Sequence, residues 1–169
     1  ARKILKIPLD KFVFLNYGIG DKRKGLHLVI RAMLEASDES RLFLLCAGQI
    51  SRNNTIRSGL DKLENLGHAK VLNRYVSDVE ETLCFCAADV VLLPYINHFG
   101  SSGVLSLAAG AGKIVVASDD GLVGRRVLEH KLGLLFSSGN TKALKNSMSQ
   151  AMSLSQFERD RFQNSASEY

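Results

Sequence analysis

The sequence predicts an α/β fold in which a doubly wound, mostly parallel sheet of six strands carries helices on both faces. Apolar runs of strand length alternate with stretches of helical period along all 169 residues, and this alternation is typical of parallel sheets. The first run, Phe12–Asn16, indicates a strand buried on both faces. With 46% apolar and 23% charged residues, the composition agrees with one globular domain over residues 1–169.

In the first half of the chain, three predicted strands alternate with two predicted helices. The strands are the runs 12–16, 42–46 and 69–72. After the first strand, apolar residues recur at the spacing of one helix face: Leu26, Val29, Ile30, Met33 and Leu34. A second apolar stripe, which Gly67 closes, consists of Ile56, Leu60 and Leu63.

A third helix is predicted to begin at Ser77, which forms a capping box with Glu80. Its buried stripe is expected to be Val79, Leu83 and Cys86. The fourth strand, 89–93, follows this helix and stops at a proline, residue 94.

The second half of the chain repeats the pattern with shorter elements. A small-residue helix at 104–109, a strand at 113–117, a short helix at 123–128 and a strand at 133–136 follow one another. Thr141 is predicted to cap a longer helix that carries Leu144, Met148 and Met152, and a further helix is expected around 157–162. We expect a Rossmann-like order, with the strand near Phe12 central and flanked by those near Leu42 and Asp89.

Charge and cysteine content exclude several classes of function. The net charge of +5 permits phosphate ligands, acidic membranes or nucleic acid. Lys and Arg are mostly scattered and Trp is absent, so nucleic-acid binding is not expected. Cys46, Cys84 and Cys86 lack zinc-site spacing, and we interpret them as reduced, buried thiols of a cytoplasmic protein. We expect no signal peptide, and no apolar run approaches the ~20 residues of a membrane span.

The loops that follow the strands are the candidate sites, because ligands of doubly wound sheets bind at the carboxyl ends of strands. The first such loop, Gly18–Gly25, is basic. It lacks the third glycine and the later acid of a dinucleotide loop, and the Lys-Ser/Thr pair of a P-loop. Lys24 can still reach an anionic ligand, with Arg23 as a secondary candidate. The alternative is a solvated turn with surface cations.

A more specific loop precedes the small-residue helix. Its segment Gly100, Ser101, Ser102, Gly103 and Val104 places backbone N–H groups at the positive end of that helix. We interpret it as a pyrophosphate cradle; the alternative is a helix cap by Ser101 or Ser102. His98 stands in the same predicted cleft and is the candidate catalytic residue. Arg125 is a further basic candidate, and Asp119–Asp120 is interpreted as a turn, so no metal site is expected.

Several segments together resemble the C-terminal domain of the retaining, two-domain group 1 glycosyltransferases. The resemblance covers nearly the whole chain and is carried by Phe12–Gly18, Lys24–Gly25, Ala88–Pro94, Ala109–Ser118 and Gly133–Phe136. It implies that the chain binds a nucleoside diphosphate sugar donor for retaining transfer to a glycan, lipid or polysaccharide acceptor. It also implies a fragment that lacks its N-terminal acceptor domain and is inactive alone, from an enzyme that can associate with the inner face of the membrane.

The resemblance also implies roles for individual residues. Lys24 matches the family's diphosphate lysine, Gly100–Val104 the loop beside the diphosphate, and Tyr75–Val76 the backbone edge that receives the base. The family's diphosphate arginine falls on Ile19, and its two glutamates fall on Phe99 and Leu107.

Two hypotheses follow from these departures. The chain is either a divergent donor-binding domain that relies on His98 and backbone groups, or a catalytically silent binding module of the same fold. We expect Leu107 to be buried apolar surface. No cofactor or metal is expected. The expected partners are the nucleotide sugar, the N-terminal domain and a glycan or lipid-linked acceptor.

Overall fold

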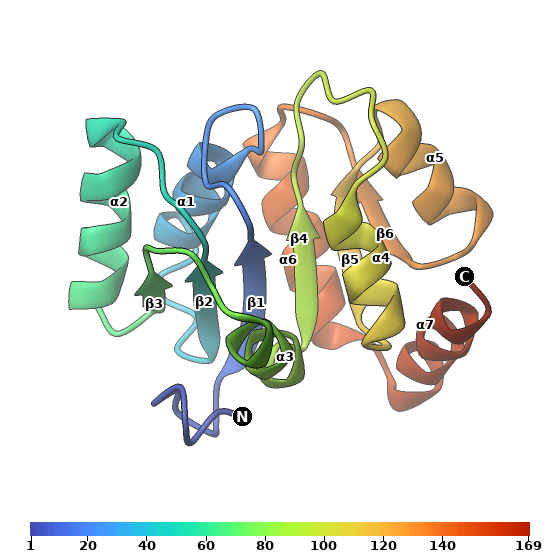
Figure 1. Cartoon of the computed structure of the whole chain (residues 1–169), viewed down its shortest axis with the longest axis horizontal. Coiled ribbons are helices and arrows are strands. Elements are labelled where there is room, and N and C mark those ends of the chain that lie inside the picture. The colour runs from blue at the N-terminus through green and yellow to red at the C-terminus, as the bar shows by residue number, and fades with distance from the viewer.

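A computed structural model of the chain describes all 169 residues as a six-stranded sheet covered by helices (Figure 1). The strand order is β3-β2-β1-β4-β5-β6, and every neighbouring pair is parallel. The central position of β1 between β2 and β4 confirms the predicted order. The strands are β1 (Phe12–Tyr17), β2 (Leu42–Ala47), β3 (Ala69–Leu72), β4 (Val90–Leu93), β5 (Ile114–Ser118) and β6 (Gly133–Phe136).

Seven helices cover the two faces of the sheet. One core of 24 buried residues includes side chains of α3, α4, α5 and α7, and a second core of 23 includes those of α1, α2 and α6. Because both faces are buried, the strands are mostly apolar, and Asn16, Lys70 and Ser118 are the polar exceptions within them. The helices are α1 (Leu26–Leu34), α2 (Asn54–Asn65), α3 (Asp78–Ala87), α4 (Gly103–Gly110), α5 (Gly121–Glu129), α6 (Thr141–Ser153) and α7 (Gln156–Glu168).

Helix α3 begins as predicted but buries a different face. The capping box between Ser77 and Glu80 is present. Val79, however, is 72% exposed and Cys86 is also exposed, so the predicted buried stripe is wrong. The helix instead buries Cys84, Phe85 and Ala87. Packing against β1 decides this face, since the Phe85 ring lies 5.2 Å from the ring of Tyr17. Cys46 and Cys84 are buried as expected.

The cap of α6 also differs from the prediction. Asn140, and not Thr141, caps this helix, because its side-chain oxygen accepts from the Ala143 N–H at 3.0 Å. The last inward position is Ala151, and Met152 is only half-buried. Helix α7 is longer than expected and starts with a second capping box, between Ser155 and Glu158.

Candidate functional site

The loops after β1 and β4 fold against each other at the carboxyl edge of the sheet, at the upper end of these strands in Figure 1. The Ile96 N–H donates to the Arg23 carbonyl at 2.9 Å. Gly25 has a φ of 72°, and a Cβ at this position would lie 1.7 Å from the Pro94 carbonyl oxygen. Only glycine therefore allows this approach. We call the structure formed by residues 18–25 and 94–104 the basic wall.

Tyr95 organises the basic wall, and sequence analysis did not single it out. It is 4% exposed, and its hydroxyl lies 2.9 Å from Ser102 Oγ. The Lys24 ammonium lies 3.7 Å from the centre of its ring, and the His98 ring meets it edge-on with centroids 4.8 Å apart. One aromatic ring thus holds a cation, a histidine and a helix cap together. The feature of the sequence that could have identified Tyr95 is its position directly after Pro94, the proline that follows β4.

The two cations of the basic wall set the electrostatics around His98. Burial lowers the pKa of Lys24, and the neighbouring Arg23 lowers it further. Burial also lowers the pKa of His98, with further lowering from Lys24 and Arg23, so the imidazole is neutral at pH 7. His98 Nδ1 lies 3.2 Å from Arg23 Nη1 and accepts from it, which places the imidazole hydrogen on Nε2. Nε2 is buried without a partner within the chain, and an unpaired buried polar atom in a native structure calls for an explanation.

The start of α4 completes the basic wall. Ser102 is the cap, because its hydroxyl accepts from the Leu105 N–H at 3.4 Å, whereas Ser101 is exposed. The N–H groups of Gly103 and Val104 have no partner within the chain. A Cβ added at Gly103 would meet nothing within 4 Å. Two free N–H donors therefore stand beside open space at the positive end of a helix, an arrangement that binds anions.

The structure brings most of the predicted anion-binding residues together, but not Arg125. Gly100 lies beside the His98 ring, at 3.8 Å from an added Cβ. Helix α5 begins at Gly121, against the His98 carbonyl, so Arg125 lies in the second turn and not at the start. Its guanidinium bonds to Glu129 at 2.8 Å, and no hydrogen bond or ion pair joins it to the basic wall.

A cavity of about 440 Å³ lies next to the basic wall, after the ends of β1, β2 and β3. It contains both residues predicted to receive a nucleoside: Val76 is buried, whereas Tyr75 is 86% exposed. Gly18 lines the cavity and also lies against Val104, so the cavity opens beside the start of α4. We call it the nucleoside cavity. Its lining residues are Tyr17, Gly18, Ile19, Gly48, Gln49, Tyr75, Val76, Asp78 and Glu81.

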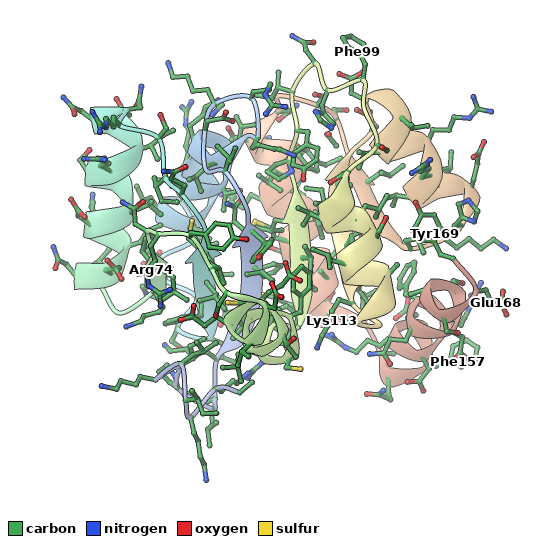
Figure 2. All side chains as sticks on the ribbon, viewed as in Figure 1. Arg74, Phe99, Lys113, Phe157, Glu168 and Tyr169 are labelled. Atoms are coloured by element: carbon green, nitrogen blue, oxygen red, sulfur yellow. The ribbon has the colours of Figure 1, made fainter.

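Three large apolar side chains are exposed near these loops. Ile19 is 54% exposed and Phe99 is 77% exposed, and Phe99 projects from the tip of the β4–α4 loop (Figure 2). Leu107 is 38% exposed, so the expectation that it is buried is wrong. Helix α4 instead packs inward through Leu105 and its neighbouring alanines, which leaves Leu107 on the outer side.

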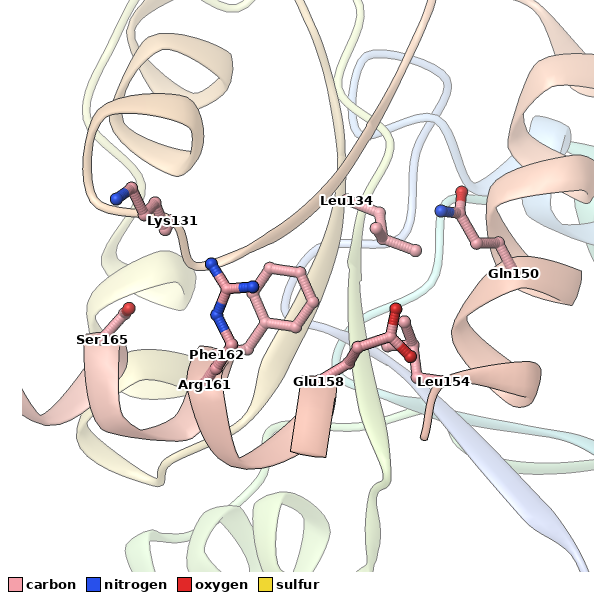
Figure 3. Close-up of a pocket in the computed structure, with 8 residues that line it drawn as sticks. All are labelled: Lys131, Leu134, Gln150, Leu154, Glu158, Arg161, Phe162 and Ser165. Carbon is pink, nitrogen blue, oxygen red and sulfur yellow. The ribbon is translucent and has the colours of Figure 1, made fainter. Parts of the chain in front are cut away.

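A smaller cavity of about 230 Å³ lies elsewhere, among residues of α6, α7 and β6 (Figure 3). Leu134, Leu154 and Phe162 give it apolar walls, and Arg161 and Lys131 stand at its side. None of its lining residues belongs to the loops after β1, β2, β3 or β4. No group of three or more potential metal ligands occurs in the structure. None of the helices is long and apolar enough to cross a bilayer.

Comparison with known proteins identifies the family of the chain and solved structures with the same fold. The model of the family "Glycosyl transferases group 1" matches residues 1–169. No curated protein matches the chain in sequence. Among solved structures, WaaG, a glycosyltransferase involved in lipopolysaccharide biosynthesis, superposes with a TM-score of 0.81 at 20% identity. The match covers 99% of this chain and 45% of WaaG, so the chain spans less than half the length of that protein.

Two further solved structures have the same fold. Anabaena Alr3699/HepE, solved in complex with UDP, gives a TM-score of 0.79 at 20% identity, over 99% of this chain and 45% of that protein. The C-terminal domain of the Francisella tularensis group 1 protein LpcC gives 0.78 at 15% identity. That match covers 98% of this chain and 87% of the LpcC domain, so a domain of this extent has been solved separately.

Proposed function

The chain belongs to the group 1 glycosyl transferases, and we propose that it holds the nucleoside diphosphate sugar donor of a retaining glycosyltransferase. The observation that carries this proposal is the meeting of Lys24, Arg23 and the free N–H groups of α4 on one wall, beside a cavity of nucleoside size. Family membership supports transfer of a sugar, and the resemblance supports retention of anomeric configuration.

The diphosphate is proposed to lie against the basic wall. The Gly103 and Val104 N–H groups donate to one phosphate, and the helix dipole adds to their attraction. Lys24 rests on Tyr95 in the structure, and its flexible stem lets the ammonium move from the ring to a phosphate oxygen. Arg23, whose guanidinium bonds to His98, is the second cation of the basic wall. We propose that the two cations neutralise the diphosphate, because the resemblance places Ile19 where the family has its diphosphate arginine.

The proposed position of the diphosphate determines where the nucleoside and the sugar of the donor lie. The nucleoside extends into the nucleoside cavity, with its base against Val76 and Tyr75. The sugar lies on the other side of the diphosphate, toward the loop that carries His98. A neutral imidazole with its hydrogen on Nε2 is able to donate a hydrogen bond to a sugar or phosphate oxygen, and this is the catalytic role that we propose for it.

The acceptor is proposed to bind elsewhere. Because the chain spans about 45% of WaaG and HepE, we propose that an N-terminal domain holds a glycan or lipid-linked acceptor. Transfer requires both reactants in register, so this chain alone should not turn over. Slow hydrolysis of the donor remains compatible with that expectation.

One observation favours a second function, a donor-like binding module without catalysis. Phe99 and Leu107 stand exposed at the positions where the resemblance places the family's two glutamates. Neither side chain is able to bind a sugar or ribose hydroxyl. In such a module the nucleotide still binds, but no donor is consumed.

Calorimetric titration of the chain with GDP and UDP, followed by an assay of nucleotide-sugar hydrolysis, tests both functions. We expect saturable binding of at least one nucleotide at or below millimolar concentration, together with slow hydrolysis of the matching sugar donor. Binding without any hydrolysis favours the silent module. If neither nucleotide binds, the donor-binding proposal is wrong.

A further inference from the structure

The nucleoside cavity carries the opposite charge from the basic wall. Asp78 and Glu81 line it, and no Lys, Arg or His does. The nearest cation in sequence, Arg74, bonds to Glu80, with one contact at 2.8 Å, and Glu80 also closes the capping box of α3. Arg74 is therefore engaged outside the cavity. A ligand group that enters the cavity meets carboxylate oxygens that no cation neutralises.

Glu81 is held in place in the lining of this cavity. The Tyr17 hydroxyl donates to Glu81 Oε2 at 2.7 Å, and both residues line the cavity. Burial and the neighbouring Glu81 raise the pKa of Tyr17, so the phenol stays protonated and remains a donor. Oε1 of Glu81 has no partner, and each carboxylate oxygen is able to accept two hydrogen bonds. The carboxylate is thus oriented and retains free acceptor capacity.

Resting on the donor-binding function proposed above, we infer that Glu81 selects the base of the nucleotide sugar and that the base is guanine. A carboxylate only accepts hydrogen bonds. Guanine presents two adjacent donors, N1–H and the N2 amino group, which pair with the two oxygens of one carboxylate. Uracil presents a single N–H between two carbonyl oxygens, which the carboxylate repels. Adenine and cytosine each offer one amino donor beside a ring acceptor, and so lie between these extremes.

The position of Glu81 relative to the proposed diphosphate site supports the same inference. Gly18 lies at the join between the cavity and the start of α4, where the diphosphate is placed. A nucleoside on that diphosphate therefore extends past Gly18 toward Tyr17 and Glu81. The base is the end of the donor farthest from the sugar, and it is the part that reaches the Glu81 carboxylate in the cavity lining. Exposed Tyr75 beside Val76 supplies an aromatic face next to the base.

Calorimetric titration of the chain with GDP, ADP, CDP and UDP tests this inference. We expect GDP to bind at least about tenfold more tightly than UDP, because charge-assisted hydrogen bonds are gained with one base and repulsion is met with the other. Glu81→Gln should bring the GDP-to-UDP ratio close to one, since an amide both donates and accepts. Tyr17→Phe should reduce the ratio in part. Glu35→Gln, an exposed acid at the end of α1, is the matched control and should leave it unchanged.

The outcomes separate the two proposals. UDP binding as tightly as GDP overturns the guanine inference and leaves the donor-binding function standing. A GDP preference that survives in Glu81→Gln shows that Glu81 does not select the base. Loss of binding to every nucleotide in the parent chain overturns the donor-binding function itself. Thermal melting of each variant shows that a changed ratio does not come from unfolding, because a folding defect weakens all nucleotides equally.

Discussion

The basic wall and the nucleoside cavity are neighbours at the same edge of the sheet, but they are built for different chemistry. The wall joins loops distant in sequence and gathers Arg23, Lys24 and the free N–H groups of α4. The cavity lies after β1, β2 and β3 and carries Asp78 and Glu81 without a cation. A ligand that suits both has an anionic part joined to a neutral part with N–H donors. We therefore expect affinity to come from the wall and selectivity to come from the cavity.

The largest expected effect comes from separating the two loops of the wall. In Gly25→Ala the new methyl group would overlap the Pro94 carbonyl, and the residue would keep a left-handed backbone. We expect a loss of about 3 kcal/mol in the free energy of unfolding, together with loss of nucleotide binding. Urea denaturation followed by circular dichroism measures the first effect.

Gly67→Ala is the matched control for that experiment. Gly67 has a φ of 73°, nearly that of Gly25, but nothing lies within 4 Å of an added Cβ. Only backbone strain of about 1 kcal/mol is expected there. Equal destabilisation by the two substitutions would mean that the contact between the loops contributes nothing.

Lys24→Ala is expected to weaken nucleoside diphosphate binding by about ten- to a hundredfold, because it removes a charge-assisted contact to phosphate. The factor should be the same for GDP and UDP, since Lys24 belongs to the wall and not to the cavity. Calorimetric titration measures both. Lys22→Ala, an exposed cation of the same turn, should change affinity little. A loss that depends on the base would contradict the division between wall and cavity.

Gly103→Val is expected to weaken binding by roughly tenfold, because the side chain fills the space in front of the free N–H groups. The substitution is sterically free in the unliganded chain, so stability should be retained. Gly110→Val, at the other end of α4 and equally open, should leave affinity unchanged. Unaltered affinity in Gly103→Val would mean that the diphosphate does not approach the start of α4.

The smallest effect concerns pH. Because the pKa of His98 is lowered below 6.5 by burial, Lys24 and Arg23, the unfolded chain binds the proton more readily than the folded chain. This destabilisation is fully present below the folded pKa and disappears as the pH rises past 6.5, so stability should increase across that window. His98→Gln should flatten the increase in part. His27, whose pKa is also lowered, keeps its own contribution in both chains. Denaturation at several pH values measures the difference in slope.

The sheet could be predicted from the sequence because its signals are local. Strands of a covered sheet are largely apolar runs, and even for the two edge strands the predicted runs at 69–72 and 133–136 match β3 and β6 in both bounds. Pro94 marks the end of β4, and Ser77 with Glu80 marks the start of α3, since each acts on its own backbone. The alternation of strands and helices was compatible with only a few sheet topologies, and the strand order was predicted from these.

The loops of the site could be located, but their arrangement could not be predicted. Lys24, His98 and Ser102 were identified one at a time, in two loops about seventy residues apart. Only their packing on Tyr95 shows that they form one unit. The acids of the cavity were not identified, because Glu81 acquires its role through Tyr17, a residue of another element.

The amino-acid sequence alone was enough to predict the fold class, the order of the strands, the family resemblance and the loops of the candidate site. The fold class and the strand order depend on backbone propensity and on apolar period, which neighbouring residues specify, whereas the resemblance depends on short motifs of particular residues. The buried face of α3, the exposure of Leu107 and the contacts of Tyr95 were decided by the folded structure. A helix with apolar residues on several sides is able to bury any of them, and the side that is buried depends on the partner that packs against it.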